Sequence, residues 1–453
     1  MKKYEFTGKT KSLLGVDVKE IRYVRDISIH GISIGDIGGY LESEDNLSHD
    51  GACVVVEEAS VMGLAIVKGN AHIKGNAMVS QQAIVGDYAR ISGYAVIYES
   101  ARILGEAIVT DDARISGTAS VSERAQIKGD AQVFGNALVA GVSIVDDRAR
   151  VYGNAILNHS QLSKSDSAHI FNQASIYGSA KVFSRATVKG NSKVFENAII
   201  RDGATICDYA VIKGKSIVCG FASVSKNAIV TGESDVDIKA VITDQAELTD
   251  AKVSGNARIE GKSSLSKGCA VYGDSRIYNS TLKTGVEVLD QAVVENSVLI
   301  GQIILTESAK ISHCDIEGNH IRVEDDAFLH SVQMENVSDI QITNKAVLSL
   351  AILRGVHQMK MFENAKIRGA NSLNRNLLIG EELSFSGMCR IEEGVAITGT
   401  RVAIKGNARL KGEINVGSDV TVSEFAEIEN IKPNAKTYIL SNTEMSMDTS
   451  IIL

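Results

Sequence analysis

Imidazole side chains are the groups of this chain best suited to general-base chemistry near neutral pH. The sequence holds nine histidines, and most of them stand alone. His159 falls in the irregular stretch from Asn158 to Ser167, and His169 follows Ala168. These two histidines are the candidates for a catalytic base, and the alternative is that both are ordinary surface or loop residues. The sequence alone assigns no residue a catalytic or cofactor-binding role.

A metal ion would need histidine, cysteine or carboxylate groups that converge. His313 and His320 are seven residues apart, and Cys314 and Asp315 follow the first of them. The six cysteines form no CxxC pair, the spacing that is typical of zinc and redox sites. The phosphate-binding motif GxxxxGK[ST] and the nucleophile motif GxSxG do not occur. We therefore expect no metal site and no bound cofactor.

A six-residue repeat is the element that must position any functional side chain. Alanine recurs at every sixth residue from Ala59 to Ala137, and a valine or isoleucine follows two residues after each alanine. Gly, Asn, Asp and Glu cluster in the two positions before the alanine, as in Gly69-Asn70-Ala71. Periods of this kind are the sequence signature of solenoid proteins.

The spacing within the repeat predicts a parallel β-helix. Residues i and i+2 of a strand point to the same side, so each alanine and the aliphatic residue after it share one face. A helix would need spacings of three and four. Glycine and asparagine tolerate the left-handed backbone of a tight corner. We expect Val79, Val85 and Ile91 to point into a narrow interior, with alanine where the corner leaves little room.

Irregularities divide the repeat. The alanine phase slips by one residue after Ala155 and returns at Ala251, and from about 286 only pairs such as Ile303/Leu305 and Ile321/Val323 remain. We expect an N-terminal cap over 1–50, a regular β-helix over 51–285, a less regular continuation over 286–432 and a C-terminal cap or tail over 433–453. That makes about twenty coils of about 18 residues, a rod about 100 Å long. Cys53 and Cys269 occupy alanine positions and should be small core residues.

Composition restricts the class of protein. The net charge is -8 with both signs interspersed, which argues against a nucleic-acid groove. There is no tryptophan, so a core of small aliphatic side chains is expected. No signal peptide and no run of about 18 apolar residues is found, so we expect a cytoplasmic protein with reduced thiols and no membrane contact.

Some outward positions of the repeat are apolar or aromatic. Ser80, Tyr98, Ser116, Phe134 and Tyr152 recur at every third hexapeptide and should share one face, whereas Ile66, Ile84, Leu138 and Ile156 should share another. Such strips are candidates for contacts between subunits, with Tyr98, Phe134, Tyr152, Ile84 and Leu138 as the expected oligomer face. The alternative is that these side chains only pack on their neighbours along the coil.

One segment carries a family resemblance. Residues 35–48 read Gly-Asp-Ile-Gly-Gly-Tyr-Leu-Glu-Ser-Glu-Asp-Asn-Leu-Ser, with Arg25-Asp26 before them and alanine hexapeptides after. This arrangement resembles the YdcK-like proteins of enterobacteria and phages, and the hexapeptides are similar to those of the trimeric LpxA-like superfamily. The resemblance implies a left-handed β-helix and a trimer. For the acyltransferases of that superfamily it implies a histidine base beside an acyl-CoA cleft between subunits.

Three functions follow from these observations. The first is a non-catalytic, rod-like scaffold or binding protein that associates with itself, or with another protein, through flat faces of the β-helix. The second is a hexapeptide-type acyltransferase, for which acyl-CoA would be the cofactor. The third is a phage-type protein that sequesters a small molecule.

Overall fold

The computed structural model describes residues 2–158 and 167–306 in full, and after residue 306 it describes the backbone of separate strands. The chain divides into two units, Met1–Gly232 and Glu233–Leu453. Both units are built as a parallel β-solenoid, so the all-β prediction is confirmed. The solenoid has about 14 turns in all, with a repeat of about 18 residues. The expectation of about twenty coils also counted the coils that residues after 306 would form.

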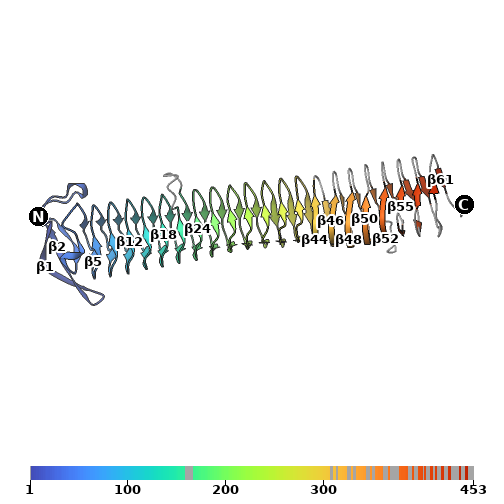
Figure 1. Ribbon diagram of the computed structural model, residues 1–453. Helices are drawn as coiled ribbons and strands as arrows, with labels where there is room; N and C mark the ends of the chain where they lie inside the picture. The colour runs from blue at the N-terminus through green and yellow to red at the C-terminus, as the bar shows by residue number, and fades with distance from the viewer. Residues whose placement is uncertain are drawn as a thin grey trace. The chain divides into compact units, whose positions relative to one another are not determined.

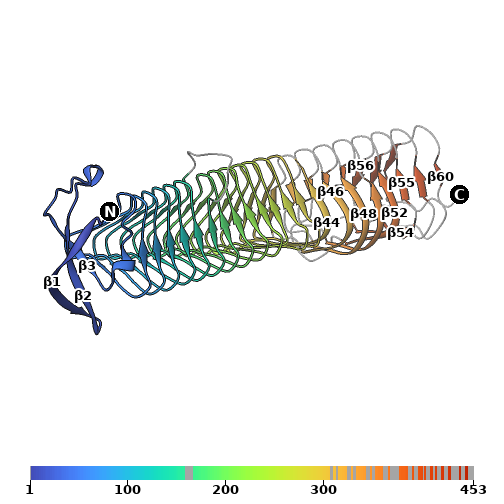
Figure 2. The same cartoon turned by 60° about the vertical axis from the view of Figure 1, so that its left-hand side comes forward.

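An antiparallel hairpin forms the N-terminal cap. β1 (Tyr4–Leu13) pairs with β2 (Val16–Tyr23), and β3 (Ile37–Leu41) continues the sheet on the other edge of β2. Figure 2 shows β1 and β2 as a twisted ribbon at the N-terminal end of the first unit. Two short 3-10 turns, η1 (Ser28–His30) and η2 (Glu44–Asn46), complete the cap.

The cap and the first coil share residues. β3 pairs in parallel with β5 (Ser60–Val61), through Tyr40 beside Ser60 and Leu41 beside Val61. Leu47 forms a parallel bridge with Val67 one coil later. The segment from β3 to Leu47 therefore already follows two sides of the solenoid before the alanine repeat begins.

Three ladders of parallel strands form the solenoid of the first unit, and each coil contributes one strand of two or three residues to each ladder (Figure 1). Face 1 contains β6 (Ile66–Val67), β9 (Ile84–Val85), β12 (Arg102–Ile103), β15 (Ser120–Val121), β18 (Leu138–Val139), β21 (Ile156–Leu157), β24 (Lys181–Val182), β27 (Ile199–Ile200) and β30 (Ile217–Val218). Face 2 contains β5, β8 (Met78–Val79), β11 (Val96–Ile97), β14 (Arg114–Ile115), β17 (Gln132–Val133), β20 (Arg150–Val151), β23 (Ser175–Ile176), β26 (Lys193–Val194), β29 (Val211–Ile212) and β32 (Ile229–Thr231). Face 3 contains β4 (Val54–Val55), β7 (His72–Ile73), β10 (Arg90–Ile91), β13 (Ile108–Val109), β16 (Gln126–Ile127), β19 (Ile144–Val145), β22 (His169–Ile170), β25 (Thr187–Val188), β28 (Thr205–Ile206) and β31 (Ser223–Val224).

The interior contains the alanine and aliphatic residues that the period predicts. Val79, Val85 and Ile91 are fully buried, as is the alanine before each of them. Serine replaces alanine at some of these positions, and its hydroxyl donates to the carbonyl three residues earlier, as from Ser143 to Ala140 at 2.7 Å. The same contact recurs at Ser192, Ser216, Ser263 and Ser275. A buried hydroxyl is tolerated there because its hydrogen bond is satisfied.

The corners explain the acidic residues and glycines of the repeat. Asp87 has φ 53° and Gly105, at the same corner one coil later, has φ 67°. The Asp87 carboxylate accepts a hydrogen bond from the backbone N–H of Gly105 at 2.9 Å. The same bond joins Asp111 to Gly129 and Glu123 to Gly141. A left-handed corner residue thus finds a partner for its N–H in the carboxylate of the preceding coil.

An insertion interrupts the first unit between β21 and β22. Its neighbours stay in register, because Ile144 of β19 pairs with His169 of β22 instead of a residue 18 positions later. The slip of the alanine phase after Ala155 is therefore an insertion at one corner, which leaves the stacking of the coils unchanged.

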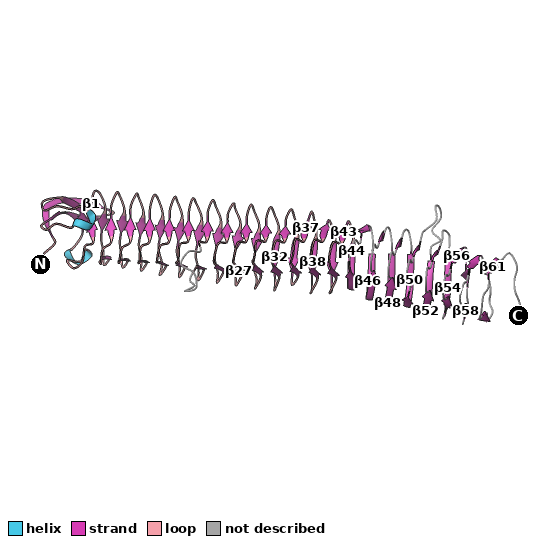
Figure 3. Ribbon diagram, turned by 90° about the horizontal axis from the view of Figure 1, so that it is seen from above, coloured by secondary structure: helices cyan, strands magenta, loops and turns pink. Residues whose placement is uncertain are grey.

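Two sides of the coil merge within the second unit. β41 (Thr281–Lys283) and β42 (Glu287–Val288) both pair with one strand, β44 (Val298–Leu305). Figure 3 shows the longer strands that follow, which are β46 (Asp315–Val323), β48 (Gln333–Ile342), β50 (Ile352–Lys360) and β52 (Leu377–Phe385). The shorter side runs through β43 (Val293–Glu295), β45 (Lys310–Ser312), β47 (Phe328–Leu329), β49 (Val347–Leu348) and β51 (Lys366–Ile367). This merger removes a corner, which is why the hexapeptide pattern coarsens near residue 286.

The remaining strands of this unit keep the parallel pairing. Before the merger come β33 (Asp235–Val236), β34 (Val241–Ile242), β35 (Glu247–Thr249), β36 (Lys252–Val253), β37 (Arg258–Glu260), β38 (Ser264–Ser266), β39 (Ala270–Val271) and β40 (Arg276–Tyr278). After β52 come β53 (Arg390–Ile391), β54 (Ala396–Thr400), β55 (Val402–Ile404), β56 (Arg409–Lys411), β57 (Ile414–Asn415), β58 (Val420–Val422), β59 (Glu427–Glu429), β60 (Tyr438–Ile439) and β61 (Glu444–Ser446). The expected pairs recur in register, with Leu305 beside Val323 and Ile321 beside Ile340.

Candidate functional site

Four aromatic rings are stacked along one corner of the first unit. Phe134, Tyr152, Tyr177 and Phe195 occupy the position after the inward aliphatic residue of β17, β20, β23 and β26. Successive ring centroids are 4.7, 4.9 and 4.7 Å apart, and the planes differ by 3°, 5° and 3°. The coil spacing of a parallel sheet brings the rings to this distance, so the stack follows directly from the period.

Tyr98, Ser80 and Ser116 occupy the same corner in earlier coils. The backbone N–H of each bonds to the next coil just as the N–H of Phe134 does. Ser116 separates Tyr98 from Phe134, so Tyr98 lies outside the stack. The sequence placed Phe134 and Tyr152 together and missed Tyr177 and Phe195, although both follow the same offset once the insertion is counted.

Face 1 carries more apolar outward side chains than face 2 or face 3. They are Ile66, Ile84, Leu138, Ile156, Ile199 and Ile217, which occupy the first position of β6, β9, β18, β21, β27 and β30. Ile66 is 40% exposed and the other five are half-buried. They come in pairs on neighbouring strands, with Arg102 and Ser120 between the first two pairs and Lys181 between the last two.

The aromatic stack and the middle of face 1 are adjacent. Phe134 follows β17 on face 2, and after the turn Gly135-Asn136 the chain enters β18 with Leu138 on face 1. Tyr152 and Ile156 have the same relation one coil later. The sequence placed these sets on separate faces, and in the structure the rings follow strands of face 2, at the corner that leads to face 1. We name Phe134, Tyr152, Tyr177, Phe195, Leu138, Ile156 and Ile199 the apolar patch.

The two candidate bases lie in different settings. His169 is exposed at the outward position of β22 on face 3, as its place after Ala168 predicted. His159 lies outside the described residues. Nothing in the described part of the chain brings another catalytic group to His169.

A histidine pair joins the cap to face 3. The ring of His30, from η1, lies 4.8 Å from the ring of His72 of β7, and His30 Nε2 donates to the Asn70 carbonyl at 3.0 Å. Burial, followed by the neighbouring His30, lowers the pKa of His72 to about 4. Burial also lowers the pKa of His30. His72 follows Ala71 at an outward position of the repeat, and there it lies beneath the cap.

A shallow charged groove lies at the corner between faces 3 and 2. Its walls come from Arg114, Gln132 and Arg150 of face 2 and from Asp112, Asp130 and Arg148 of the corner. Arg148 Nε lies 3.6 Å from Asp130 Oδ2, and both side chains are exposed. Because carboxylates balance most of the arginine charge, the groove has no strong preference for an anion.

The motif residues hold the cap against the first coil. An added Cβ at Gly39 would lie 2.4 Å from the Ala59 carbonyl oxygen, and one at Gly38 would lie 2.6 Å from Ile21. The buried Asn46 amide donates to the carbonyls of Gly63 and Ala65 at 2.9 Å each. These glycines permit close approach of β3, and Asn46 satisfies two carbonyls of the solenoid end.

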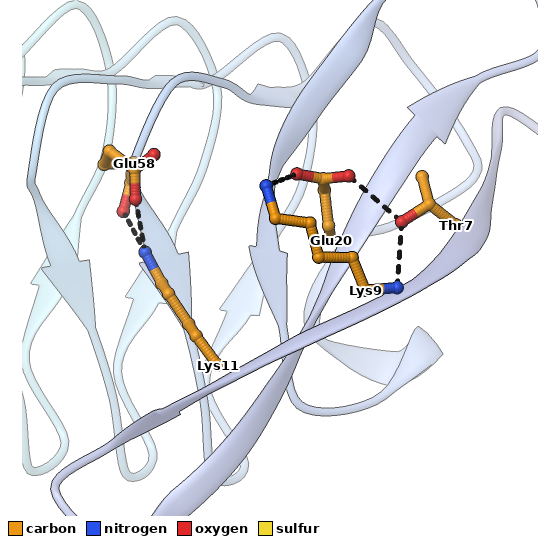
Figure 4. A network of polar contacts seen from close by, with 5 residues as sticks. All are labelled: Thr7, Lys9, Lys11, Glu20 and Glu58. Carbon is orange, nitrogen blue, oxygen red and sulfur yellow. Dashed lines mark hydrogen bonds and ion pairs between the residues drawn. The ribbon is translucent and has the colours of Figure 1, made fainter.

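Ion pairs complete this attachment, as Figure 4 shows. Lys11 Nζ lies 2.7 Å from Glu58 Oε2 of the first coil and 3.5 Å from the centroid of the Tyr40 ring. Glu20 accepts from Lys9 at 2.8 Å and from Thr7 at 3.1 Å within the hairpin. Through Gly38, Gly39 and Asn46, residues 35–48 therefore have a structural role in this chain, as the connection between hairpin and solenoid.

The other candidate groups remain apart. Among the described residues there is no group of three or more His, Cys, Asp or Glu side chains that could hold a metal ion. His313 and Cys314 lie outside the described residues, and His320 lies in β46, for which only the backbone is described. Cys53 and Cys269 are buried in alanine positions, as predicted. Within the described ranges no helix is long and apolar enough to span a bilayer.

Comparison with known proteins agrees with this architecture. No curated protein matches the chain. Residues 249–350, in the second unit, match the family model for the GlmU-like C-terminal hexapeptide region. The chain is thus similar to GlmU-like hexapeptide proteins over this segment, and its β-solenoid is consistent with the LpxA-like superfamily of left-handed β-helices.

Proposed function

We propose that this protein is a non-catalytic scaffold that associates with copies of itself through the apolar patch. The observation that carries the proposal is the stack of four rings at the corner that leads to face 1. Leu138, Ile156 and Ile199 of face 1 follow three of these rings by four residues each. Contiguous apolar surface on a soluble protein marks a contact site more often than isolated apolar residues do.

The composition of face 1 supports a contact between protein surfaces. Aliphatic pairs alternate along face 1 with Arg102, Ser120 and Lys181, and the aromatic stack lies at its edge. Interfaces between proteins combine apolar and aromatic contacts with polar residues in this way. A closed ring of identical subunits buries the same patch on every copy. The LpxA-like resemblance favours three copies and a left-handed coil, and both belong to this proposal.

The acyltransferase alternative would place a base beside an acyl-CoA cleft between subunits. The exposed position of His169 on face 3, away from the apolar patch on face 1, gives this alternative no support. It becomes an outcome of the test. Acetyl-CoA that binds the purified oligomer, in calorimetry, with an affinity that His169→Gln lowers would overturn the non-catalytic proposal.

Sedimentation of the full chain tests the self-association. We expect an oligomer for the natural chain and a monomer for the double variant Leu138→Asp with Ile156→Asp. Ile108→Asp is the matched control, because Ile108 is a half-buried outward residue on face 3. A monomeric natural chain, or equal dissociation by the control, would overturn the proposal.

A further inference from the structure

A lysine and a cysteine meet inside the joint between cap and solenoid. Lys3 Nζ lies 3.0 Å from Cys53 Sγ, and neither residue is exposed to solvent. Lys3 immediately precedes β1, whereas Cys53 immediately precedes β4 in an alanine position of the first coil. Fully buried lysines are rare unless they are paired. Cys53 supplies the only hydrogen bond that Lys3 Nζ makes among the described residues.

The backbone holds the two groups in this position. Lys3 N–H donates to His49 Nδ1 at 3.1 Å, and the Lys3 carbonyl accepts from Val24 at 3.0 Å. Carbonyl oxygens of Ser48 and Val67 lie 3.5 Å from Cys53 Sγ. The thiol is therefore surrounded by polar atoms, and the Lys3 amine is the nearest of them.

We propose that Lys3 and Cys53 are an oxidative cross-linking site, at which hydrogen peroxide joins the cap covalently to the first coil. The two nucleophilic groups already touch, so the reaction needs no rearrangement of the backbone. The product is a sulfenamide, a single bond between Sγ of Cys53 and Nζ of Lys3.

The first step makes a sulfenic acid. The Lys3 amine takes the thiol proton, and burial, which lowers the pKa of Lys3, keeps an unprotonated amine accessible for this role. The thiolate attacks peroxide, so that an S–O bond forms and the O–O bond breaks. The hydroxide that leaves takes the proton back from Lys3 and becomes water.

The second step forms the cross-link. The neutral amine attacks the sulfur of the sulfenic acid, an S–N bond forms and the S–O bond breaks, in the way that a sulfenic acid condenses with nitrogen. The departing hydroxide takes one proton from the nitrogen and leaves as water. Overall, the amine and thiol lose two hydrogens, and one peroxide is reduced to two waters.

Cys269 is the internal control. It occupies the same alanine position, is fully buried, and its Sγ donates to the Ser266 carbonyl at 2.9 Å, but among the residues that the structure describes no lysine amine bonds to it. Burial raises the pKa of the Cys269 thiol. A buried thiol without a base stays unreactive, so Cys269 should remain reduced while Cys53 reacts.

Peptide mapping of the full chain after peroxide treatment tests the proposal. We expect a linked peptide pair containing Lys3 and Cys53, lighter by two hydrogens than the sum of its parts and separated again by dithiothreitol. The variant Lys3→Met should lose this pair completely, and Lys9→Met, which changes another hairpin lysine, should retain it. A natural chain in which Cys53 stays reduced, or is oxidised without any bond to Lys3, would overturn the inference whether or not the variants fold.

Discussion

The rings of Phe134 and Tyr152 lie parallel, with centroids 4.7 Å apart, at equivalent positions of consecutive coils. The Tyr152 ring lies between two others, because Tyr177 stacks on its opposite side at 4.9 Å. The apolar patch therefore combines two roles. Its rings stabilise the stacking of coils within one chain, and they lie at the corner that leads to the face proposed to contact another chain.

Removal of the middle ring should loosen these coils. Tyr152→Ala deletes two stacked pairs, each of which contributes about 0.5–1.5 kcal/mol beyond area burial. Tyr98→Ala is the control, because Tyr98 has the same corner position with serines on both sides. Amide hydrogen exchange in β17, β20 and β23 measures the effect, since long repeat arrays do not unfold in one step. If Tyr98→Ala accelerates amide exchange around position 98 as much as Tyr152→Ala does around position 152, the stack has no special role.

The corner carboxylates should contribute through their hydrogen bonds. In Asp87→Ala the N–H of Gly105 loses its acceptor, and alanine tolerates the left-handed backbone less well than aspartate does. The free energy of local opening should therefore fall by about 1 kcal/mol. Asp87→Asn keeps an oxygen acceptor and tolerates the backbone, so it should behave nearly as the natural chain. Exchange of the Gly105 amide is the readout. If the Gly105 amide exchanges as fast in Asp87→Asn as in Asp87→Ala, the negative charge of Asp87, and not its oxygen acceptor, stabilises the corner.

The alanine positions should accept serine and reject valine. Ala119 is fully buried, and serine at equivalent positions bonds to the carbonyl three residues earlier. Ala119→Ser should therefore change stability little, whereas Ala119→Val should cost about 1–3 kcal/mol by overpacking the corner. Thermal unfolding of the two variants side by side measures the difference. A valine variant as stable as the natural chain would contradict the account of why alanine recurs.

Acidification should release the cap from face 3. The pKa of His72 is about 4, below its ordinary value of 6.5, so the fold favours the neutral ring. This contribution is present above about pH 6.5 and is lost as the pH falls toward 4. Protonated His72 would face His30, Arg90 and Lys74, with Glu57 as the opposing charge. Hydrogen exchange around η1 should accelerate over this range.

His72→Gln should remove most of that acceleration, because glutamine does not titrate. His169→Gln is the matched control, since His169 occupies the equivalent outward position of β22 and is exposed. If the natural chain and His72→Gln respond equally to acid, the histidine pair is not the cause.

The period alone was sufficient to predict the interior. Ala-x-Val at every sixth residue requires the two side chains to share a face, and Val79 and Ile91 are buried as expected. The motif around Gly38, Gly39 and Asn46 was visible as a pattern, but its role was not. That role depends on carbonyls of Ala59, Gly63 and Ala65, which only the folded coil brings near.

Contacts between different coils, and between the cap and the first coil, could not be predicted directly from the sequence. The bond from Gly105 to Asp87 spans 18 residues, and the contact between Lys3 and Cys53 spans 50. The first could have been found by aligning acidic residues and glycines at one-coil spacing. The second has no periodic signal, because Lys3 precedes the repeat and approaches it only through the hairpin.

Photo-crosslinking tests the central claim most directly. A photoactivatable phenylalanine analogue at position 138 lies within the apolar patch, and the same analogue at position 108 lies on face 3. On irradiation of the full chain, position 138 should yield covalent chain-to-chain products, up to three linked chains, and position 108 should yield none. Products only from position 108, or no chain-to-chain products from position 138, would contradict self-association through this patch.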